Sequence, residues 1–286
     1  MAALDAAVAR ARRLGLERGE PLERAKRLFA FLHRDLIASG YEASATDLAH
    51  VLETGRYNCV SSAVLYDALL ERFGIEAAGV EVPGHAFSLV RVPGGDVDVE
   101  TTCPGWFDAM GDEAALGRMV ERATGFAYLS DRHSCMRREV DPLGLVAIVY
   151  YNRGVELARV GRFDEAIAAN LKALAIDPAS ASSLQNLVAS YNGWALRSAR
   201  ASRFEEALAL IDEARAIHPF DPVFRLNERA VFAHWTADLA GRGDFARAVG
   251  VADLAVRRAP GDASFRGARA AVFARWARAT ASIDAG

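Results

Sequence analysis

Cysteine is scarce in this chain, which has only three cysteines among 286 residues. Secreted domains that depend on disulfides carry a denser and usually even set, so the count favours reduced thiols in the cytoplasm. Neither sign of charge is in large excess, because 34 basic and 37 acidic residues give a formal net charge of −3. The two signs are interspersed along the sequence, and nucleic acid is therefore not an expected partner.

Long apolar runs and nucleotide-binding loops are also missing. No stretch of about 18 consecutive apolar residues occurs, so no membrane span is expected. Residues 1–13 carry arginines with no apolar run after them, unlike a secretory signal. Neither a P-loop nor a GxGxxG sequence is present. We expect a cytoplasmic protein that does not bind membranes and requires no cofactor.

Two kinds of sequence meet near Asp141. With 52% hydrophobic and 25% charged residues, the chain is long enough to form two domains with cores of their own. Residues 1–141 mix helical and strand-like patterns and predict an α+β domain, whereas residues 142–286 are helical throughout. Within the first domain, the patterns predict three helices and an antiparallel meander of three strands. The helices are expected at 21–37, 45–52 and 59–73, and the strands at 77–82, 86–92 and 97–102.

Three rows of residues in the second domain recur every 41 positions. They are Pro178, Pro219 and Pro260, then Trp194, Trp235 and Trp276, and finally Tyr191, Phe232 and Phe273. Rows in register indicate stacked helical repeats, with residues 262–283 as a capping helix. The tryptophans are expected to pack between neighbouring repeats, and stacking on a ligand is the alternative.

The first repeat resembles a tetratricopeptide repeat. The positions that carry this resemblance are Gly154, Leu157, Gly161, Ala166, Ala173 and Pro178. The family's usual length is about 34 residues, so the longer spacing here predicts about two extra helical turns in each later first helix. The resemblance implies a surface that binds a peptide or protein.

Cys59 is the candidate nucleophile. It stands at the predicted start of a helix, where unpaired N–H groups and the helix dipole favour a thiolate over a thiol. Asn58 either offers its amide to an oxyanion or caps this helix.

His85 and Glu100 are the candidate base and orienting acid. If Pro93 and Gly94 form the turn between their strands, Glu100 lies opposite Phe87 and diagonal to His85 on the same face. Asp98 lies one pleat further from His85 than Glu100 does, opposite Leu89, and is the weaker candidate for orienting the imidazole. A slip of one residue would turn Glu100 to the other face.

Three segments together resemble the motif blocks of the transglutaminase-like superfamily, at 55–62, 82–87 and 99–102. The resemblance covers about residues 22–104. It implies a papain-like core with Cys59 as nucleophile, His85 as base and acid, and Glu100 as third member. Many relatives have aspartate at the third place. The superfamily includes peptidases, amidases, deamidases and cross-linking acyltransferases, together with members that have lost activity.

These patterns predict a cysteine-dependent acyl-transfer enzyme, a peptidase or amidase rather than a cross-linking enzyme. Its substrate is expected to be an amide or ester of a peptide or protein, recruited by the repeats. In the alternative, the first domain is inactive and the repeats make the protein an adaptor.

Two further hypotheses compete with catalysis. In one, Cys59 and His85 are simply core residues. In the other, Cys103, His133 and Cys135 bind a metal ion, although their spacing matches no common zinc pattern. We therefore predict no metal site.

Overall fold

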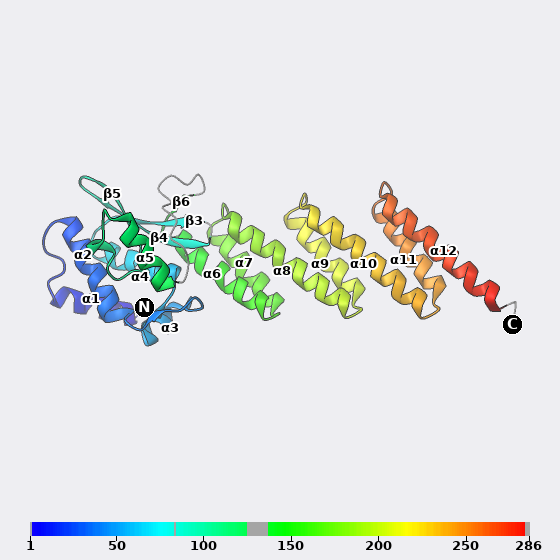
Figure 1. Cartoon of the computed structure of the whole chain (residues 1–286), viewed down its shortest axis with the longest axis horizontal. Coiled ribbons are helices and arrows are strands. Elements are labelled where there is room, and N and C mark those ends of the chain that lie inside the picture. Colours follow the sequence, from blue (N-terminus) through cyan, green and yellow to red (C-terminus); the bar gives the residue numbers. More distant parts are fainter. Residues whose placement is uncertain (1, 83, 125–136, 284–286) are drawn as a thin grey trace. The chain divides into compact units, whose positions relative to one another are not determined.

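The computed structural model describes residues 2–82, 84–124 and 137–283 (Figure 1). They form two compact units. The first consists of Met1–Glu156 and Ala168–Ser183, and the second of Leu157–Ile167 and Leu184–Gly286. The helices that follow Asp141 are therefore divided between the two units.

The first unit is α+β, as predicted. Its helices are α1 (Ala2–Arg13), α2 (Pro21–Phe31), α3 (Leu48–Thr54), α4 (Cys59–Arg72), α5 (Glu113–Thr124) and α6 (Pro142–Arg159), with a π-helical turn at Leu32–Leu36 and a short 3-10 helix at Trp106–Asp108. Strands β1 (Gly40–Tyr41) and β2 (Arg56–Tyr57) form a parallel pair. Strands β3 (Ala77–Val82), β4 (His85–Val92), β5 (Gly95–Val99) and β6 (Arg138–Val140) form an antiparallel sheet in the order β5-β4-β3-β6.

The predicted register of the hairpin is confirmed. Ser88 pairs with Val99, and Leu89 pairs with Asp98. The predicted meander is also present, but β5 ends at Val99 rather than at residue 102. The ladder stops there because the backbone N–H of Thr102 donates to the Glu100 side chain, at 3.0 Å, and bends the chain away from the strand. The short strand β6 was not predicted.

Helix α4 forms the centre of the first unit. It packs against α2 and against β3 and β4, so one long side faces the sheet. The largest fully buried side chains around it are those of Phe29, Leu28, Tyr66, Leu69 and Leu70. Because this helix is held on both sides, its first residue, Cys59, has a fixed place at the end of the sheet.

The helix predicted at 21–37 is continuous but changes its winding, from α in α2 to π at Leu32–Leu36. The helix predicted at 45–52 begins later, at Leu48, because the Asp47 side chain accepts the N–H of Ala49 and caps it.

The second unit is all helical. Its complete helices are α9 (Phe204–Ile217), α10 (Pro222–Gly241), α11 (Phe245–Arg258) and α12 (Ala263–Ile283). Helices α7 (Phe163–Ile176) and α8 (Ala181–Arg200) are divided between the units, and the last residues of α6 belong to the second. Helices α8 and α10 have 20 residues each, whereas α9 and α11 have 14. The extra length of the later repeats thus lies in their first helices, as predicted. Helix α12 packs against α10 and α11 as the predicted cap.

The tryptophan row packs between neighbouring helix pairs. Trp235 stacks on Phe204 with 5.7 Å between ring centroids, and Trp276 stacks on Phe245 at 6.3 Å. In each case, the first helix of one pair meets the second helix of the pair before it. This arrangement supports a packing role for these aromatic rings.

Two glycines inside helices are expected to respond in opposite ways to alanine. A Cβ atom at Gly154 would lie 2.5 Å from the buried Asn170 amide, whereas nothing lies within 4 Å of a Cβ at Gly250. We expect Gly154→Ala to lower the free energy of unfolding by about 1–3 kcal/mol, because the core is overpacked. Gly250→Ala should raise it by about 0.4–1 kcal/mol. Thermal unfolding of both variants tests this, and equal stabilities would contradict it.

Candidate active site

Cys59 is the first residue of α4, and Asn58 caps that helix. The Asn58 Oδ1 atom accepts the N–H of Ser61 at 2.9 Å, and the Ser61 hydroxyl accepts the N–H of Asn58 at 2.9 Å. The amide nitrogen of Asn58 donates to the carbonyl of Ala43 and to the hydroxyl of Thr46, each at 3.1 Å. Asn58 therefore caps the helix and does not offer its amide to an oxyanion, because its side-chain oxygen and nitrogen are already hydrogen-bonded within the protein.

The thiol of Cys59 lies at the positive end of α4 and is partly exposed. Among the described residues, no acceptor is present for the N–H of Cys59 or of Val60. The next two N–H groups are satisfied, that of Ser61 by Asn58 and that of Ser62 by the Asn58 carbonyl at 3.0 Å. Two donors are thus left beside the sulfur, which is the arrangement that stabilises an oxyanion.

His85 and Glu100 are in direct contact. The distance from His85 Nε2 to Glu100 Oε2 is 2.6 Å. The other carboxylate oxygen, Oε1, accepts the N–H and the hydroxyl of Thr102 at 3.0 and 2.7 Å. The Glu100 side chain is only 3% exposed, whereas that of His85 is 27% exposed. A buried carboxylate therefore holds one ring nitrogen, and the ring remains reachable from solvent.

The environment of His85 favours its protonated form. Burial lowers its pKa, but the charge of Glu100 and hydrogen bonds with Cys59 and Glu100 together raise the pKa to about 11. Glu100 occupies Nε2, so Nδ1 is the ring nitrogen that Glu100 leaves unoccupied. The structure therefore brings the three predicted residues into one interacting group, in which Glu100 contacts His85 and both Glu100 and Cys59 raise the pKa of His85.

His85 is expected to keep its proton in the folded protein at neutral pH. Its pKa lies above the ordinary value of about 6.5, so the stability gained from this proton is complete below that pH and is lost as the pH rises toward about 11. The stability difference between the wild type and Glu100→Gln should shrink over this window. Denaturant titrations at about pH 6, 8 and 10 measure it, and a constant difference would contradict the expectation.

A second histidine, His33, was not expected at the site. It lies in the π-helical turn and is buried, and its pKa responds both to the backbone of Thr101 and to the charge of Glu100. Burial lowers its pKa to about 4, so it is neutral and does not compete with His85 for the carboxylate. Its position four residues after Phe29 was a signal for burial, but the contact with Thr101 depends on tertiary structure.

Helix α6 adds Tyr151 to the surroundings of Cys59. Both side chains pack against one cluster of apolar residues, which consists of Val60, Ala63, Ala86, Val140, Leu145 and Ile148. The Tyr151 hydroxyl donates to Glu81 at 3.4 Å. Burial and the charges of Glu81 and Cys59 raise the pKa of Tyr151. Sequence reasoning missed this residue because it lies beyond Asp141, in the part read as repeats.

The other candidates lie elsewhere. Asp98 pairs with Arg137 through two contacts, at 2.7 and 2.9 Å, rather than with His85. Cys103 is buried, and burial raises its pKa to about 12. His133 and Cys135 lie outside the described residues. Within the part of the chain that is described, no three His, Cys, Asp or Glu side chains gather as metal ligands.

Two family models match the chain. Residues 1–133 match the transglutaminase-like superfamily, and residues 147–180 match the tetratricopeptide repeat. The chain joins a transglutaminase-like domain to a tetratricopeptide repeat. The predicted domain boundary at Asp141 falls between the two matches. No curated protein matches the chain.

The two matches have different consequences for function. The transglutaminase-like superfamily generally contains cysteine hydrolases and acyltransferases, and its domains also occur without activity, so the match alone does not choose a reaction. The tetratricopeptide repeat indicates interaction with another protein. None of the described helices has the length and apolar character needed to cross a membrane.

Proposed function

We propose that the transglutaminase-like domain is a cysteine-dependent enzyme that transfers acyl groups from an amide or ester of a peptide or protein. Water is the default acceptor, which makes the protein a peptidase or amidase. The observation that carries the proposal is the contact of His85 with Glu100 at 2.6 Å, together with the position of Cys59 at the N-terminus of α4, where it interacts with the same imidazole and helps to raise its pKa. A thiol, an imidazole and a carboxylate in this order form the relay that activates a cysteine nucleophile.

In the proposed reaction, the Cys59 thiolate attacks the carbonyl carbon. The negative charge that develops on the carbonyl oxygen is stabilised by the N–H groups of Cys59 and Val60, which lack other acceptors among the described residues. His85 gives its proton to the leaving amine or alcohol as the tetrahedral intermediate collapses to a thioester. Water, deprotonated by His85, then attacks the thioester carbonyl, and collapse of this second intermediate releases the acid and restores the Cys59 thiolate beside the protonated His85.

Glu100 has a positioning role in this scheme. Its two bonds from Thr102 fix one oxygen and leave the other for His85. The carboxylate keeps the ring in one orientation and stabilises the imidazolium, as the third member of such triads does. Glutamate at this place, where many relatives have aspartate, suits the diagonal reach from the end of β5 to His85.

We assign the two parts of the chain separate roles, with catalysis in residues 1–141 and recruitment of the substrate in residues 142–286. The repeats favour this division because stacked helix pairs present extended binding surfaces. The compartment proposed is the cytoplasm, where thiols stay reduced. The alternative function is that of an adaptor without catalytic activity, and the following experiment distinguishes it from an enzyme.

Selective alkylation tests the activated thiol. With limiting iodoacetamide near neutral pH, Cys59 should be labelled faster than Cys103 and Cys135, because a thiolate at a helix N-terminus is the reactive form. Peptide mass spectrometry of the labelled protein gives the three rates. His85→Ala is the matched control and should slow the labelling of Cys59 alone. Equal rates at the three cysteines would exclude catalysis by Cys59 and favour the adaptor.

A further inference from the structure

One edge of the repeat stack carries charges at positions where residues 41 places earlier in the sequence are apolar. Five positions change together over the spacing of 41 residues. Leu174, Leu184, Leu187, Val188 and Ile217 are followed by Arg215, Arg225, Glu228, Arg229 and Arg258. Repeats that stack in the same way place such positions at equivalent points of successive interfaces. The change therefore affects one edge of the stack, where α9 and α11 end and α10 begins.

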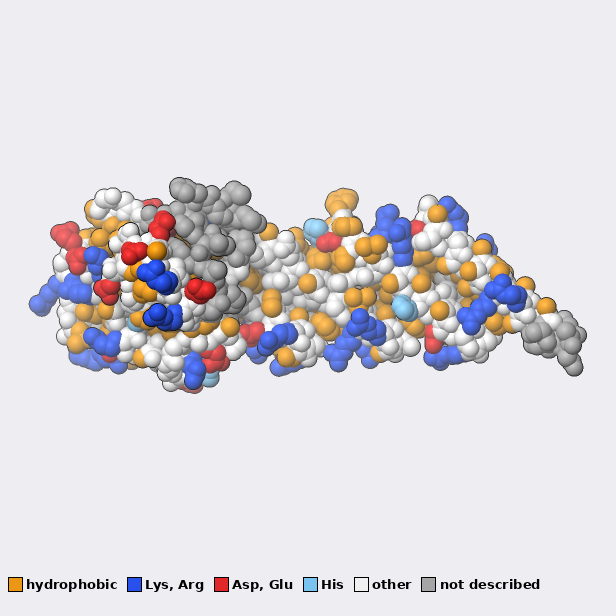
Figure 2. All heavy atoms as spheres, viewed as in Figure 1, with side chains coloured by type: hydrophobic (Ala, Val, Ile, Leu, Met, Phe, Trp, Pro, Cys, Tyr) orange, Lys and Arg blue, Asp and Glu red, His pale blue; other side chains and the backbone are white. Residues whose placement is uncertain are grey.

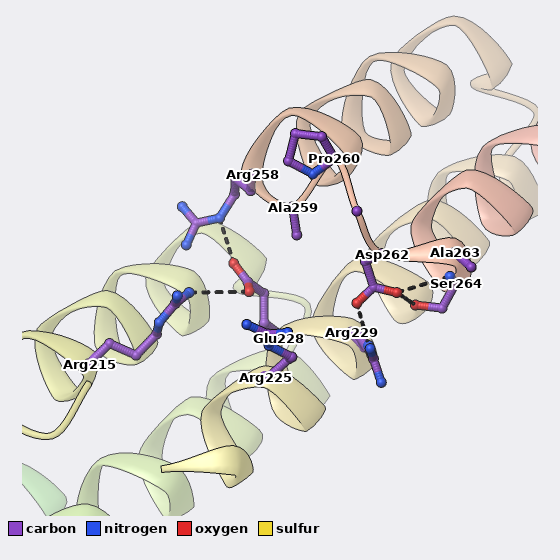
Figure 3. Close-up of a pocket in the computed structure, with 11 residues that line it drawn as sticks. Arg215, Arg225, Glu228, Arg229, Arg258, Ala259, Pro260, Asp262, Ala263 and Ser264 are labelled. Atoms are coloured by element: carbon purple, nitrogen blue, oxygen red, sulfur yellow. Dashed lines mark hydrogen bonds and ion pairs between the residues drawn. The ribbon is translucent and has the colours of Figure 1, made fainter. Parts of the chain in front are cut away.

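A buried carboxylate organises this edge (Figure 3). The Glu228 side chain is 4% exposed and contacts Arg215 from α9 at 3.3 Å and Arg258 from α11 at 2.6 Å. At the next position of α10, Arg229 pairs with Asp262 at 2.6 Å. Three guanidinium groups from different helices are thus held at fixed positions before any ligand arrives.

Helix stacking does not require these charges. Leu187, one repeat earlier, is buried at the position of Glu228. Taking a carboxylate out of water is costly, and apolar replacements of buried ion pairs are often neutral or stabilising. A function other than stability therefore explains the charged set better.

Two neighbouring cavities open onto these arginines. One, of about 550 Å³, is lined by Arg215, Arg225, Arg229 and Arg258 together with Glu228 and the turn at residues 259–264. The other, of about 460 Å³, shares the first three arginines and adds Phe220 and Leu226. Phe220 is 92% exposed and Leu226 is 60% exposed, an unusual amount of apolar surface beside a cationic cavity.

The charge balance indicates the sign of the ligand. Residues 222–286 contain ten arginines, no lysine and six acidic residues, although the whole chain is acidic. Figure 2 shows arginine side chains spread over the α10–α12 part of the visible face. Arg225 has no acidic partner among the described residues. Arginine is the side chain best suited to bind carboxylates through two parallel hydrogen bonds.

We propose that this edge of the repeats binds an acidic peptide segment that also carries an apolar side chain. Its carboxylates bind Arg215, Arg225 and Arg229, and its apolar side chain packs on Phe220 and Leu226. The buried Glu228 keeps Arg215 from swinging into solvent. The site is independent of the cysteine chemistry, since all of its residues lie in the second unit.

The test uses the full chain with Cys59→Ala, so that no peptide is consumed. The probe is a fluorescein-labelled peptide with the sequence Glu-Glu-Leu-Glu-Glu-Phe, and binding is followed by fluorescence anisotropy. Arg225→Gln and Arg225→Leu, which restores the residue of the preceding repeat, should weaken binding about tenfold. Arg242→Gln is the matched control, since Arg242 lines neither cavity and its side chain is 66% exposed. It should change binding less than about twofold.

Two further peptides separate charge from apolar contact. Replacing every Glu of the probe by Gln, or Leu and Phe by Ala, should each weaken binding by wild-type repeats. Absence of binding to the original probe, equal binding of the Gln peptide, or an unchanged affinity in both Arg225 variants would overturn the proposal. Thermal unfolding of each variant confirms that the repeats are intact. None of these results affects the proposed chemistry, which the alkylation rates at Cys59 test separately.

Discussion

Replacing Cys59 by alanine is expected to lower turnover by about 10⁴-fold or more and to abolish the covalent acyl intermediate. The sulfur is the only protein atom that forms a bond to the substrate in the proposed reaction, so the variant has no nucleophile. Incubation of the protein with a peptide pool from a cell extract, followed by intact-mass measurement, should reveal an acyl adduct in the wild type and none in Cys59→Ala.

Cys103→Ala provides the matched control. Cys103 is buried, and its thiol pairs with the Thr102 hydroxyl at 3.8 Å, so the adduct should persist in this variant, while stability falls because a buried side chain is lost. An adduct on Cys59→Ala, or its loss in a folded Cys103→Ala, would remove Cys59 from the mechanism.

Glu100→Gln is expected to have the second largest effect, a loss of about 10³–10⁴-fold in turnover. The amide keeps the shape of the side chain but removes the charge that raises the pKa of His85. The ring then loses both its orientation and its proton. The titration of His85, followed by NMR, should move to lower pH in this variant, and turnover measured alongside it tests the link between the two.

Asp98→Asn separates this effect from a general loss of negative charge. Asp98 lies in β5, two residues before Glu100 and opposite Leu89, and binds Arg137. Turnover of this variant should stay within a few-fold of the wild type, because the carboxylate does not contact the imidazole. Equal losses in Glu100→Gln and Asp98→Asn would show that Glu100 has no special role.

The β4–β5 hairpin shows which features turn geometry and residue alternation can predict and which they cannot. The turn at Pro93 and Gly94 fixed the register, and the register placed Glu100 on the face of His85. The prediction failed at the end of β5, because a side-chain bond from Glu100 to the Thr102 backbone competes with the ladder. Such competition depends on which partner is nearby in the folded chain, and a strand pattern does not contain that information.

The residues around the candidate site could not be predicted from the sequence, because they are brought together by tertiary packing. His33 and Tyr151 are distant in sequence from His85 and Glu100. They come near the site only because the π-helical turn after α2 and helix α6 pack in the same unit. The apolar positions of these helices predict a buried face but not the element that covers it.

By itself, the sequence determined the α+β and helical parts, the 41-residue repeat, the capped start of α4 and the three residues proposed for catalysis. These features follow from short-range rules of periodicity, capping and turn geometry, which act over a few residues. Only the tertiary structure decided which nitrogen of His85 contacts Glu100, that the Asn58 amide is hydrogen-bonded as part of a helix cap, and that Arg215 and Arg258 from two helices converge on a buried Glu228. Those outcomes depend on burial and on the satisfaction of polar groups, which are properties of the packed chain rather than of any segment.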